Sequence, residues 1–347
     1  MNYNRIYAAV SAITAILPCL CQCANALEIQ EPLPLVGVNF AGSAFGAAPG
    51  RPGWDYFYPN MSSIDYFAAK GATIIRLCVL WERVQPQLGS DLNFSEMKLI
   101  DGAIANARSR GMRVLLDIHN YAAFAGSKIG TDKVSIEQFS DLWKRLAARY
   151  RDDQSVAFGL MNEPVSLATE TWLDATNAAI REIRATGAKN LIMVPGNGWS
   201  SAHDWFSSSY GSPNATLMNR AQDPKNNMIY EVHQYFDVGA TGTHATCIDA
   251  ASAVAVIAPF TQWARMNGRK AFLGEFGVGP DPNCLKALQN VLEHMQDNRD
   301  VWTGWTYWAA GPWPKDYFTN IEPDGGKDRP QMTVLQQFMG HATAPRN

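Results

Sequence analysis

The stretch RVLLDIH at residues 113–119 is a short apolar run that closes on polar side chains, and the same pattern recurs along the chain. Because the apolar residues are nearly continuous and do not alternate with polar ones, each run predicts a strand of a parallel sheet covered on both faces. The runs lie at 35–40, 73–80, 113–119, 155–162, 190–195, 227–233, 270–275 and 301–308. The sequence therefore predicts eight buried parallel strands.

Segments with helical periodicity separate these runs. They lie at 94–110, 136–150, 169–186, 251–267 and 285–297. Gly71, Gly111, Gly187 and Gly268 stand where a helix must stop before the next strand, the usual place for glycine. Repeated strand-then-helix units in one domain of about 300 residues predict an α/β protein with a single (β/α)8 TIM barrel, in preference to a doubly wound open sheet.

The composition excludes several classes of protein. Of 347 residues, 47% are hydrophobic and 18% are charged, which excludes a disordered chain. The 29 Lys and Arg against 32 Asp and Glu give a net charge of only -3, so we expect no nucleic-acid partner. No low-complexity linker or internal repeat divides the chain, and we expect a monomer.

The N-terminus has the layout of a secretory signal peptide. Arg5 precedes an apolar run at 6–17, and small residues end the segment at 24–26. The run is shorter than the roughly 20 residues that span a bilayer, so we expect no membrane association after cleavage. We therefore predict a signal peptide at 1–26, a catalytic domain at 27–347, and secretion to the extracellular or periplasmic space.

Removal of the signal peptide would leave Cys78, Cys247 and Cys284 of the six cysteines. In an oxidising compartment Cys247 and Cys284 are the favoured disulfide pair, because both stand in turn-rich stretches, whereas Cys78 lies in the apolar run TIIRLCVLW and is expected to be a buried thiol. The sequence contains no CxxC, HExxH, GxGxxG or Walker motif. We expect no metal and no cofactor.

In a (β/α)8 barrel the functional side chains stand at the C-terminal ends of the strands. The polar and aromatic residues at these ends are Asn39, Arg76, His119, Asn120, Tyr121, Asn162, Glu163, Trp199, His233, Tyr235, Glu275 and Trp308. Glu163 and Glu275 close the fourth and seventh runs, which a barrel places across its mouth from each other. Two carboxylates with aromatic platforms are what the cleavage of a glycosidic bond requires.

Four segments carry a family resemblance: LMNEP at 160–164, LDIHNYA at 116–122, EVHQYFD at 231–237 and FLGEFG at 272–277. The chain resembles glycoside hydrolase family five, the large cellulase family, and within it the secreted endoglucanases of fungi and bacteria. The resemblance runs in order from GVNFAGSAFG at 37–46 to WTYWAAGPW at 305–313.

The resemblance implies a retaining mechanism in which Glu163 is the general acid/base and Glu275 the nucleophile. It implies that Arg76 and Tyr235 hold the nucleophile ionised and oriented, and that Asn162 binds the sugar 2-hydroxyl. It makes His119 and His233 cleft residues that bind hydroxyls and support the acid/base, and Trp308 the platform beside the cleaved bond. Asn120, Tyr121 and Trp199 are further substrate-binding candidates, and the Cys247–Cys284 disulfide would brace the loop after the nucleophile.

The leading hypothesis is a secreted endo-β-1,4-glucanase acting on cellulose or soluble β-glucan. A β-mannanase or a broad glucan or glucomannan hydrolase is the alternative, because loops and not the Glu pair decide between these substrates. A sugar-binding protein without turnover would predict loss of one carboxylate, and both are present. Trp199, Trp205 and Trp313 are left open between sugar stacking and packing, whereas Trp143, Trp172 and Trp263 fall inside predicted helices and are expected to pack the barrel.

Overall fold

The computed structural model describes Met1, residues 31–314 and residues 316–340. The predicted signal peptide at 1–26 lies outside the described residues, apart from Met1. Residues from Pro32 onward form one compact unit. The candidate site residues all belong to this unit.

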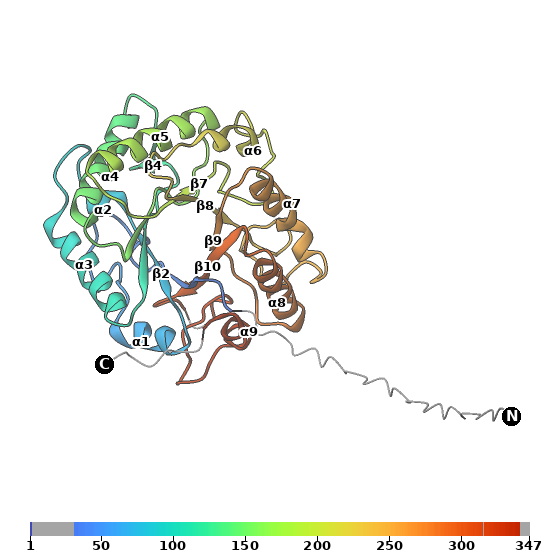
Figure 1. The fold of residues 1–347 in the computed structure, drawn as a ribbon. Helices are drawn as coiled ribbons and strands as arrows, with labels where there is room; N and C mark the ends of the chain where they lie inside the picture. Colours follow the sequence, from blue (N-terminus) through green and yellow to red (C-terminus); the bar gives the residue numbers. More distant parts are fainter. Residues whose placement is uncertain (2–30, 315, 341–347) are drawn as a thin grey trace. The chain divides into compact units, whose positions relative to one another are not determined.

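Eight parallel strands close into a barrel, and helices surround it (Figure 1). Around the barrel the strands follow the order β1-β10-β9-β8-β7-β6-β3-β2, so that β1 closes the sheet by pairing with β10. The bounds are β1 Leu35–Phe40, β2 Ile74–Val79, β3 Arg113–Ile118, β6 Val156–Gly159, β7 Ile192–Pro195, β8 Met228–His233, β9 Ala271–Glu275 and β10 Trp302–Ala310. The predicted fold and all eight predicted strands are confirmed.

The five predicted helices are also present. They are α3 Phe94–Arg108, α4 Ile136–Tyr150, α5 Thr169–Ala185, α7 Ala253–Met266 and α8 Pro282–Asp297. The prediction for α8 began three residues late, because Asp281 caps the helix through the backbone N–H groups of Asn283 and Cys284 and Pro282 occupies the first turn. Gly71, Gly111, Gly187 and Gly268 all have positive φ, as expected of residues that end helices.

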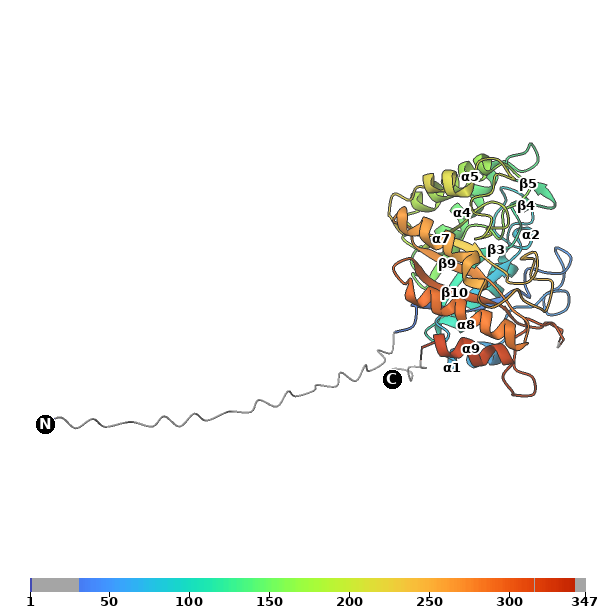
Figure 2. The same cartoon turned by 90° about the vertical axis from the view of Figure 1, so that its right-hand side faces the viewer.

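The sequence analysis did not predict several further elements. These are α1 Met61–Ala69, α2 Trp81–Val84, the hairpin of β4 Ala123–Phe124 and β5 Ser127–Lys128, α6 Asn214–Leu217, the 3-10 helix η1 Met218–Arg220, and α9 Pro330–Phe338. Figure 2 shows the β4–β5 hairpin and α2 at one end of the barrel. Most of these elements are only two to four residues long, too short to carry a periodic pattern.

Alternate residues of each strand point into the barrel, and they are layered along its axis. The deepest layer is apolar and consists of Leu35, Ile74, Leu115, Ala157, Met193, Ile229 and Phe272. Two residues further along β2, β3 and β8 stand Arg76, Asp117 and Glu231, all fully buried. Two residues beyond these come Cys78, His119 and His233. The interior therefore changes from apolar to charged towards the C-terminal ends of the strands.

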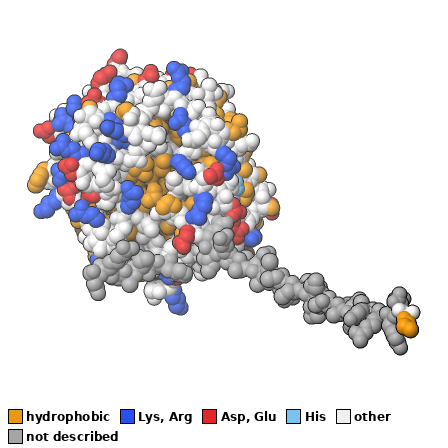
Figure 3. Space-filling view, in the orientation of Figure 1, with side chains coloured by type: hydrophobic (Ala, Val, Ile, Leu, Met, Phe, Trp, Pro, Cys, Tyr) orange, Lys and Arg blue, Asp and Glu red, His pale blue; other side chains and the backbone are white. Residues whose placement is uncertain are grey.

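Among the described residues, no helix has both the length and the apolar character that crossing a membrane would require. On the face drawn in Figure 3, acidic and basic side chains are interspersed around an apolar centre. This face carries no block of a single charge sign.

Candidate active site

Glu163 and Glu275 meet at the C-terminal end of the barrel. Glu275 is the last residue of β9, and Glu163 follows β6 in a left-handed backbone conformation with φ of 44°. One carboxylate oxygen of each lies within 4.8 Å of the other. A non-glycine residue at positive φ is strained, and such strain concentrates at functional sites. The turn therefore places Glu163 opposite Glu275 at some cost in backbone energy.

The hydroxyl of Tyr235 donates to Oε1 of Glu275 at 2.5 Å, while Nη1 of Arg76 lies 3.5 Å from Oε2. Burial and the charge of Glu163 raise the pKa of Glu275, against the opposite effects of His233 and Arg76. Arg76 thus lowers the pKa of Glu275, as predicted, but its effect is outweighed by the effects that raise this pKa. The net shift is upward because the carboxyl is buried beside a second carboxyl.

His233 lies between carboxylates. Its Nδ1 is 2.8 Å from Oε1 of Glu163, and its Nε2 is 3.4 Å from Oε1 of Glu231. Burial opposes a charged ring, but the charge of Glu275 and the hydrogen bonds to Glu163 and Glu231 raise the pKa of His233 to about 10. At neutral pH the ring is an imidazolium that donates to both sides.

Arg76 is fully buried, where a charge without a carboxylate partner would be costly. The structure provides three: Nε lies 2.8 Å from Glu231, Nη2 lies 3.1 Å from Asp117, and Nη1 lies 3.5 Å from Glu275. The sequence analysis missed Asp117 and Glu231. The sequence signal for each was a carboxylate inside an apolar strand, two positions before a histidine. Residues two apart on a strand share a face, so the carboxylate and the histidine must both point into the barrel.

The side-chain amide of Asn162 is hydrogen-bonded through its oxygen but not through its nitrogen. Its Oδ1 accepts a hydrogen bond from Nη2 of Arg76 at 2.8 Å. Its Nδ2 is buried and has no hydrogen-bond partner among the described residues. Since buried donors are nearly always paired, this amide is a ready donor for a hydroxyl group of a ligand.

Aromatic rings form one continuous wall of the site. The ring of His119 stacks on Trp308 with centroids 5.7 Å apart and planes at 14°, and Tyr121 meets His119 edge-on at 5.6 Å. Trp199, whose side chain is 48% exposed, continues the wall 6.0 Å from Tyr121. Phe45, which the sequence analysis did not single out, packs against Trp308 at 6.2 Å. Flat apolar faces at this spacing suit the faces of pyranose rings.

Asn120, a predicted substrate contact, lies at the site but also holds neighbouring loops. It lines a cavity of about 700 Å³ that also reaches His119 and Tyr121. However, its Oδ1 accepts from the backbone N–H of Trp81 at 2.7 Å, and its Nδ2 donates to Glu82 at 2.7 Å. Both ends of the amide therefore hold the loops together, while the second N–H of Nδ2 is left over from these two bonds.

The other tryptophans fall into two groups. Trp205 is fully buried against Tyr230 and Trp263, so the open choice resolves to packing. Trp313 is half-buried and contacts Trp308 at 5.8 Å, at the edge of the aromatic wall. The helix-borne Trp143, Trp172 and Trp263 are buried, as predicted.

Cys247 and Cys284 form a disulfide with Cα atoms 5.2 Å apart, and Cys78 is a free buried thiol. The disulfide ties the loop after β8 to the first turn of α8. This loop reaches the site, because a Cβ on Gly242 would stand 2.7 Å from the ring of Tyr235.

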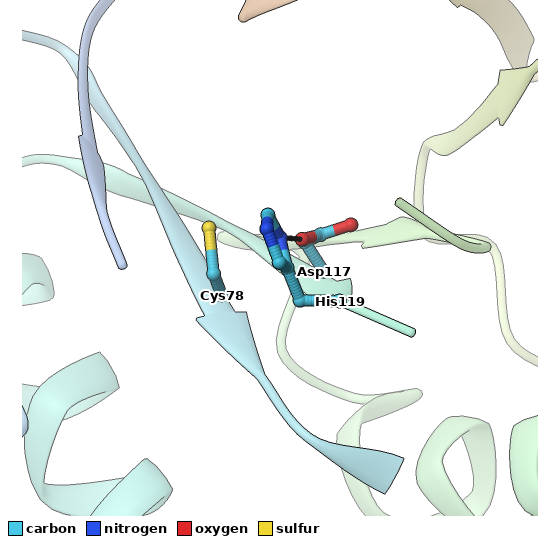
Figure 4. A group of neighbouring side chains, drawn as sticks. All are labelled: Cys78, Asp117 and His119. Carbon is cyan, nitrogen blue, oxygen red and sulfur yellow. Dashed lines mark hydrogen bonds and ion pairs between the residues drawn. The ribbon is translucent and has the colours of Figure 1, made fainter. Parts of the chain in front are cut away.

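Cys78, Asp117 and His119 have atoms within 4.8 Å of one another that could bind a metal (Figure 4). Arg76 already lies beside them, with Nη1 3.5 Å from the sulfur of Cys78 and Nη2 3.1 Å from Asp117. A guanidinium therefore supplies the positive charge that a metal ion would bring, and the group suits an ion pair better than a metal.

Comparisons with known proteins identify the family of the chain. Residues 36–311 match the family model described as Cellulase (glycosyl hydrolase family 5). Endo-beta-1,4-glucanase B of Emericella nidulans is 32% identical, covering 98% of this chain and all of the relative. XacCel5A, solved in complex with cellopentaose, is 44% identical with a TM-score of 0.87, covering 88% of this chain and 99% of that one. Endoglucanase Cel5A of Pseudomonas stutzeri, solved with cellobiose, is 36% identical with a TM-score of 0.82, covering 90% and 94%. The chain therefore belongs to glycosyl hydrolase family 5 and is a glycoside hydrolase.

Proposed function

We propose that the protein is a secreted, retaining endo-β-1,4-glucanase that cuts internal bonds of cellulose or soluble β-glucan. The observation that carries the proposal is the pair Glu163 and Glu275, whose carboxylate oxygens approach within 4.8 Å at the end of an aromatic wall. Retaining glycosidases hold their carboxyls about 5–5.5 Å apart, whereas inverting enzymes need a wider gap for water. The relatives named for β-1,4-glucanase activity support the substrate class.

In this proposal Glu275 attacks the anomeric carbon and Glu163 protonates the leaving oxygen, then activates water to release the glycosyl-enzyme. The hydroxyl of Tyr235 and the guanidinium of Arg76 orient Glu275. The open Nδ2 of Asn162 donates a hydrogen bond to the oxygen of the sugar 2-hydroxyl. The imidazolium of His233 holds the carboxylate of Glu163 after its proton has left.

The aromatic wall binds the substrate. Trp308 carries the sugar beside the cleaved bond, while His119, Tyr121 and Trp199 extend the contact along the chain. We also propose that residues 1–26 are removed on secretion, so that N-terminal sequencing of the secreted protein would begin at Leu27.

The test compares Glu275→Gln and Glu163→Gln with the matched variant Glu96→Gln on carboxymethylcellulose, glucomannan and galactomannan. Glu96 is also buried, but it lies on α3 outside the site and accepts hydrogen bonds from Tyr56 and Tyr58. We expect the first two changes to lower kcat by about a thousandfold or more and the third to leave it near wild type.

Carboxymethylcellulose should be the preferred substrate, and NMR of the first product from a cello-oligosaccharide should show the β-anomer. An α-anomer appearing first would refute retention. Wild-type hydrolysis by Glu275→Gln would refute the proposed nucleophile.

A further inference from the structure

Arg76 carries one positive charge and faces three buried carboxylates. Glu231 and Asp117 take its two shortest ion-pair contacts, at 2.8 and 3.1 Å, and Glu275 takes the longest, at 3.5 Å. The side chains of Arg76, Asp117 and Glu231 have no exposed surface, so bulk solvent does not screen these contacts. The positive charge is therefore shared mainly between two residues that stand behind the nucleophile.

Asp117 and Glu231 occupy equivalent places on β3 and β8. Each lies two residues before a histidine of the site and contacts it: Oδ2 of Asp117 is 2.8 Å from Nδ1 of His119 (Figure 4), and Oε1 of Glu231 is 3.4 Å from Nε2 of His233. Both carboxylates thus join Arg76 to a histidine of the site and are themselves fully buried.

Strand β9 makes room for Glu231. A Cβ on Gly274, the residue before the nucleophile, would stand 2.1 Å from Oε1 of Glu231. A buried carboxylate is expensive unless it is paired, and apolar residues fill such positions with equal or better stability. Stability alone therefore does not account for a glycine that admits the carboxylate of Glu231 beside an arginine that already contacts two others.

We propose that Asp117 and Glu231 are positioning residues that take up most of the charge of Arg76, so that Glu275 remains oriented by the guanidinium but keeps the electron density it needs as a nucleophile. This inference rests on the proposed function. A full guanidinium charge on Glu275 alone would stabilise the carboxylate and weaken its attack on the sugar.

The direction in which the pKa of Glu275 changes when Glu231 or Asp117 is neutralised follows from the groups that face Glu275. They are Arg76 and Cys78 from β2, His119 after β3, Glu163 after β6, His233 at the end of β8 and Tyr235 after it. The side chain of Glu163 is 13% exposed, whereas Arg76, Cys78, His119 and His233 are buried. Removing the charge of Glu231 or Asp117 leaves Arg76 less compensated, so the pKa of Glu275 falls. His233, with a pKa of about 10, stays protonated throughout the acidic range and adds no opposing change there.

The experiment measures kcat/KM against pH for wild type, Glu231→Gln and Asp117→Asn on a soluble cello-oligosaccharide. The acidic limb reports ionisation of the nucleophile in the free enzyme. We expect its midpoint to move down by about 0.5–1 pH unit in both variants, with kcat/KM on the plateau lowered about tenfold. Asp223→Asn is the matched control, because it neutralises a buried partner of another arginine, Arg184, far along the chain from these residues. Its midpoint should equal that of wild type.

The midpoint does not depend on how much of a preparation is folded, so partial misfolding leaves the readout intact. The inference is overturned if both variants keep the wild-type midpoint or move it upward, and also if neither variant yields folded protein, since the pair would then serve the stability of the barrel. A wild-type protein that hydrolyses no β-glucan would instead overturn the proposed function.

Discussion

Tyr235 and Arg76 both contact Glu275, but the hydroxyl of Tyr235 is the closer, at 2.5 Å against 3.5 Å. The phenol and the guanidinium also differ in kind. The phenol gives Glu275 a hydrogen bond that belongs to it alone, whereas the guanidinium is shared with Asp117 and Glu231. Orientation of the nucleophile should therefore depend more on Tyr235 than on Arg76.

Tyr235→Phe removes the donor that favours the ionised form of Glu275, so the pKa of Glu275 should rise further and the acidic limb of kcat/KM should move up by about one pH unit. This is the opposite direction from Glu231→Gln. We expect kcat to fall about 10²-fold. Tyr230→Phe is the control, because it removes a buried hydroxyl on the same strand that donates to the carbonyl of Met218. An acidic limb that stays in place in Tyr235→Phe would contradict the assignment.

Residues at strand ends were predictable from the sequence, since Glu163 and Glu275 follow from the rule that polar side chains at the C-terminal ends of strands converge. In the layer one step deeper, the sequence analysis named only Arg76. Asp117 and Glu231 required the further step of following every second residue into the barrel. Trp199 and Trp205 both follow β7, and the sequence does not distinguish their environments. In the structure Trp199 has a φ of 63° and is exposed, whereas Trp205 is fully buried.

At the scale of elements, the loop after β8 connects the disulfide to the nucleophile. Asp237 accepts hydrogen bonds from the backbone N–H groups of Gly242, Thr243 and His244, which folds the loop on itself. Gly242, with φ of 69°, lies against the ring of Tyr235. Cys247 then anchors the end of the loop to Cys284. A loose loop would therefore release the ring that holds Glu275.

Replacing both Cys247 and Cys284 by Ser should lower the free energy of unfolding by about 2–4 kcal/mol, because the disulfide closes a loop across 37 residues. Urea unfolding followed by tryptophan fluorescence measures this change. Reductant should bring wild type to the midpoint of the variant and leave the variant unchanged, since Cys78 is a free thiol in both. Equal midpoints for wild type and variant without reductant would contradict the role of the disulfide.

The long elements of the barrel could be predicted because their patterns extend over several turns or a full buried strand. The hairpin β4–β5 could not, because each strand has two residues and its shape depends on Tyr121, Ala122 and Ala125 at positive φ. No residue there is glycine except Gly126, so the usual sequence signal for such turns is largely missing.

At the scale of the whole molecule, the barrel separates a catalytic end from an end that serves stability. Arg184 in the last turn of α5 donates to the carbonyls of Ala188 and Asn190 before β7 and pairs with Asp223 before β8. These contacts lie where β7 and β8 begin, whereas the site lies where the strands end. Changes at Arg184 and Asp223 should therefore affect stability without affecting catalysis.

Asp223→Asn tests this separation. Burial acts against ionisation, but Arg184 and the backbone N–H groups of Lys225 and Asn227 lower the pKa of Asp223 below its usual value. A lowered folded-state pKa means that the stabilisation is present above about pH 4 and is lost as pH falls through the folded-state value. We expect the variant to lose about 2–4 kcal/mol of unfolding free energy at pH 7 and less at pH 3. Urea unfolding at the two pH values measures this, and kcat/KM at pH 7 should equal that of wild type. A loss of the same size at both pH values would show that packing, and not the charge of Asp223, ties α5 to the start of β8.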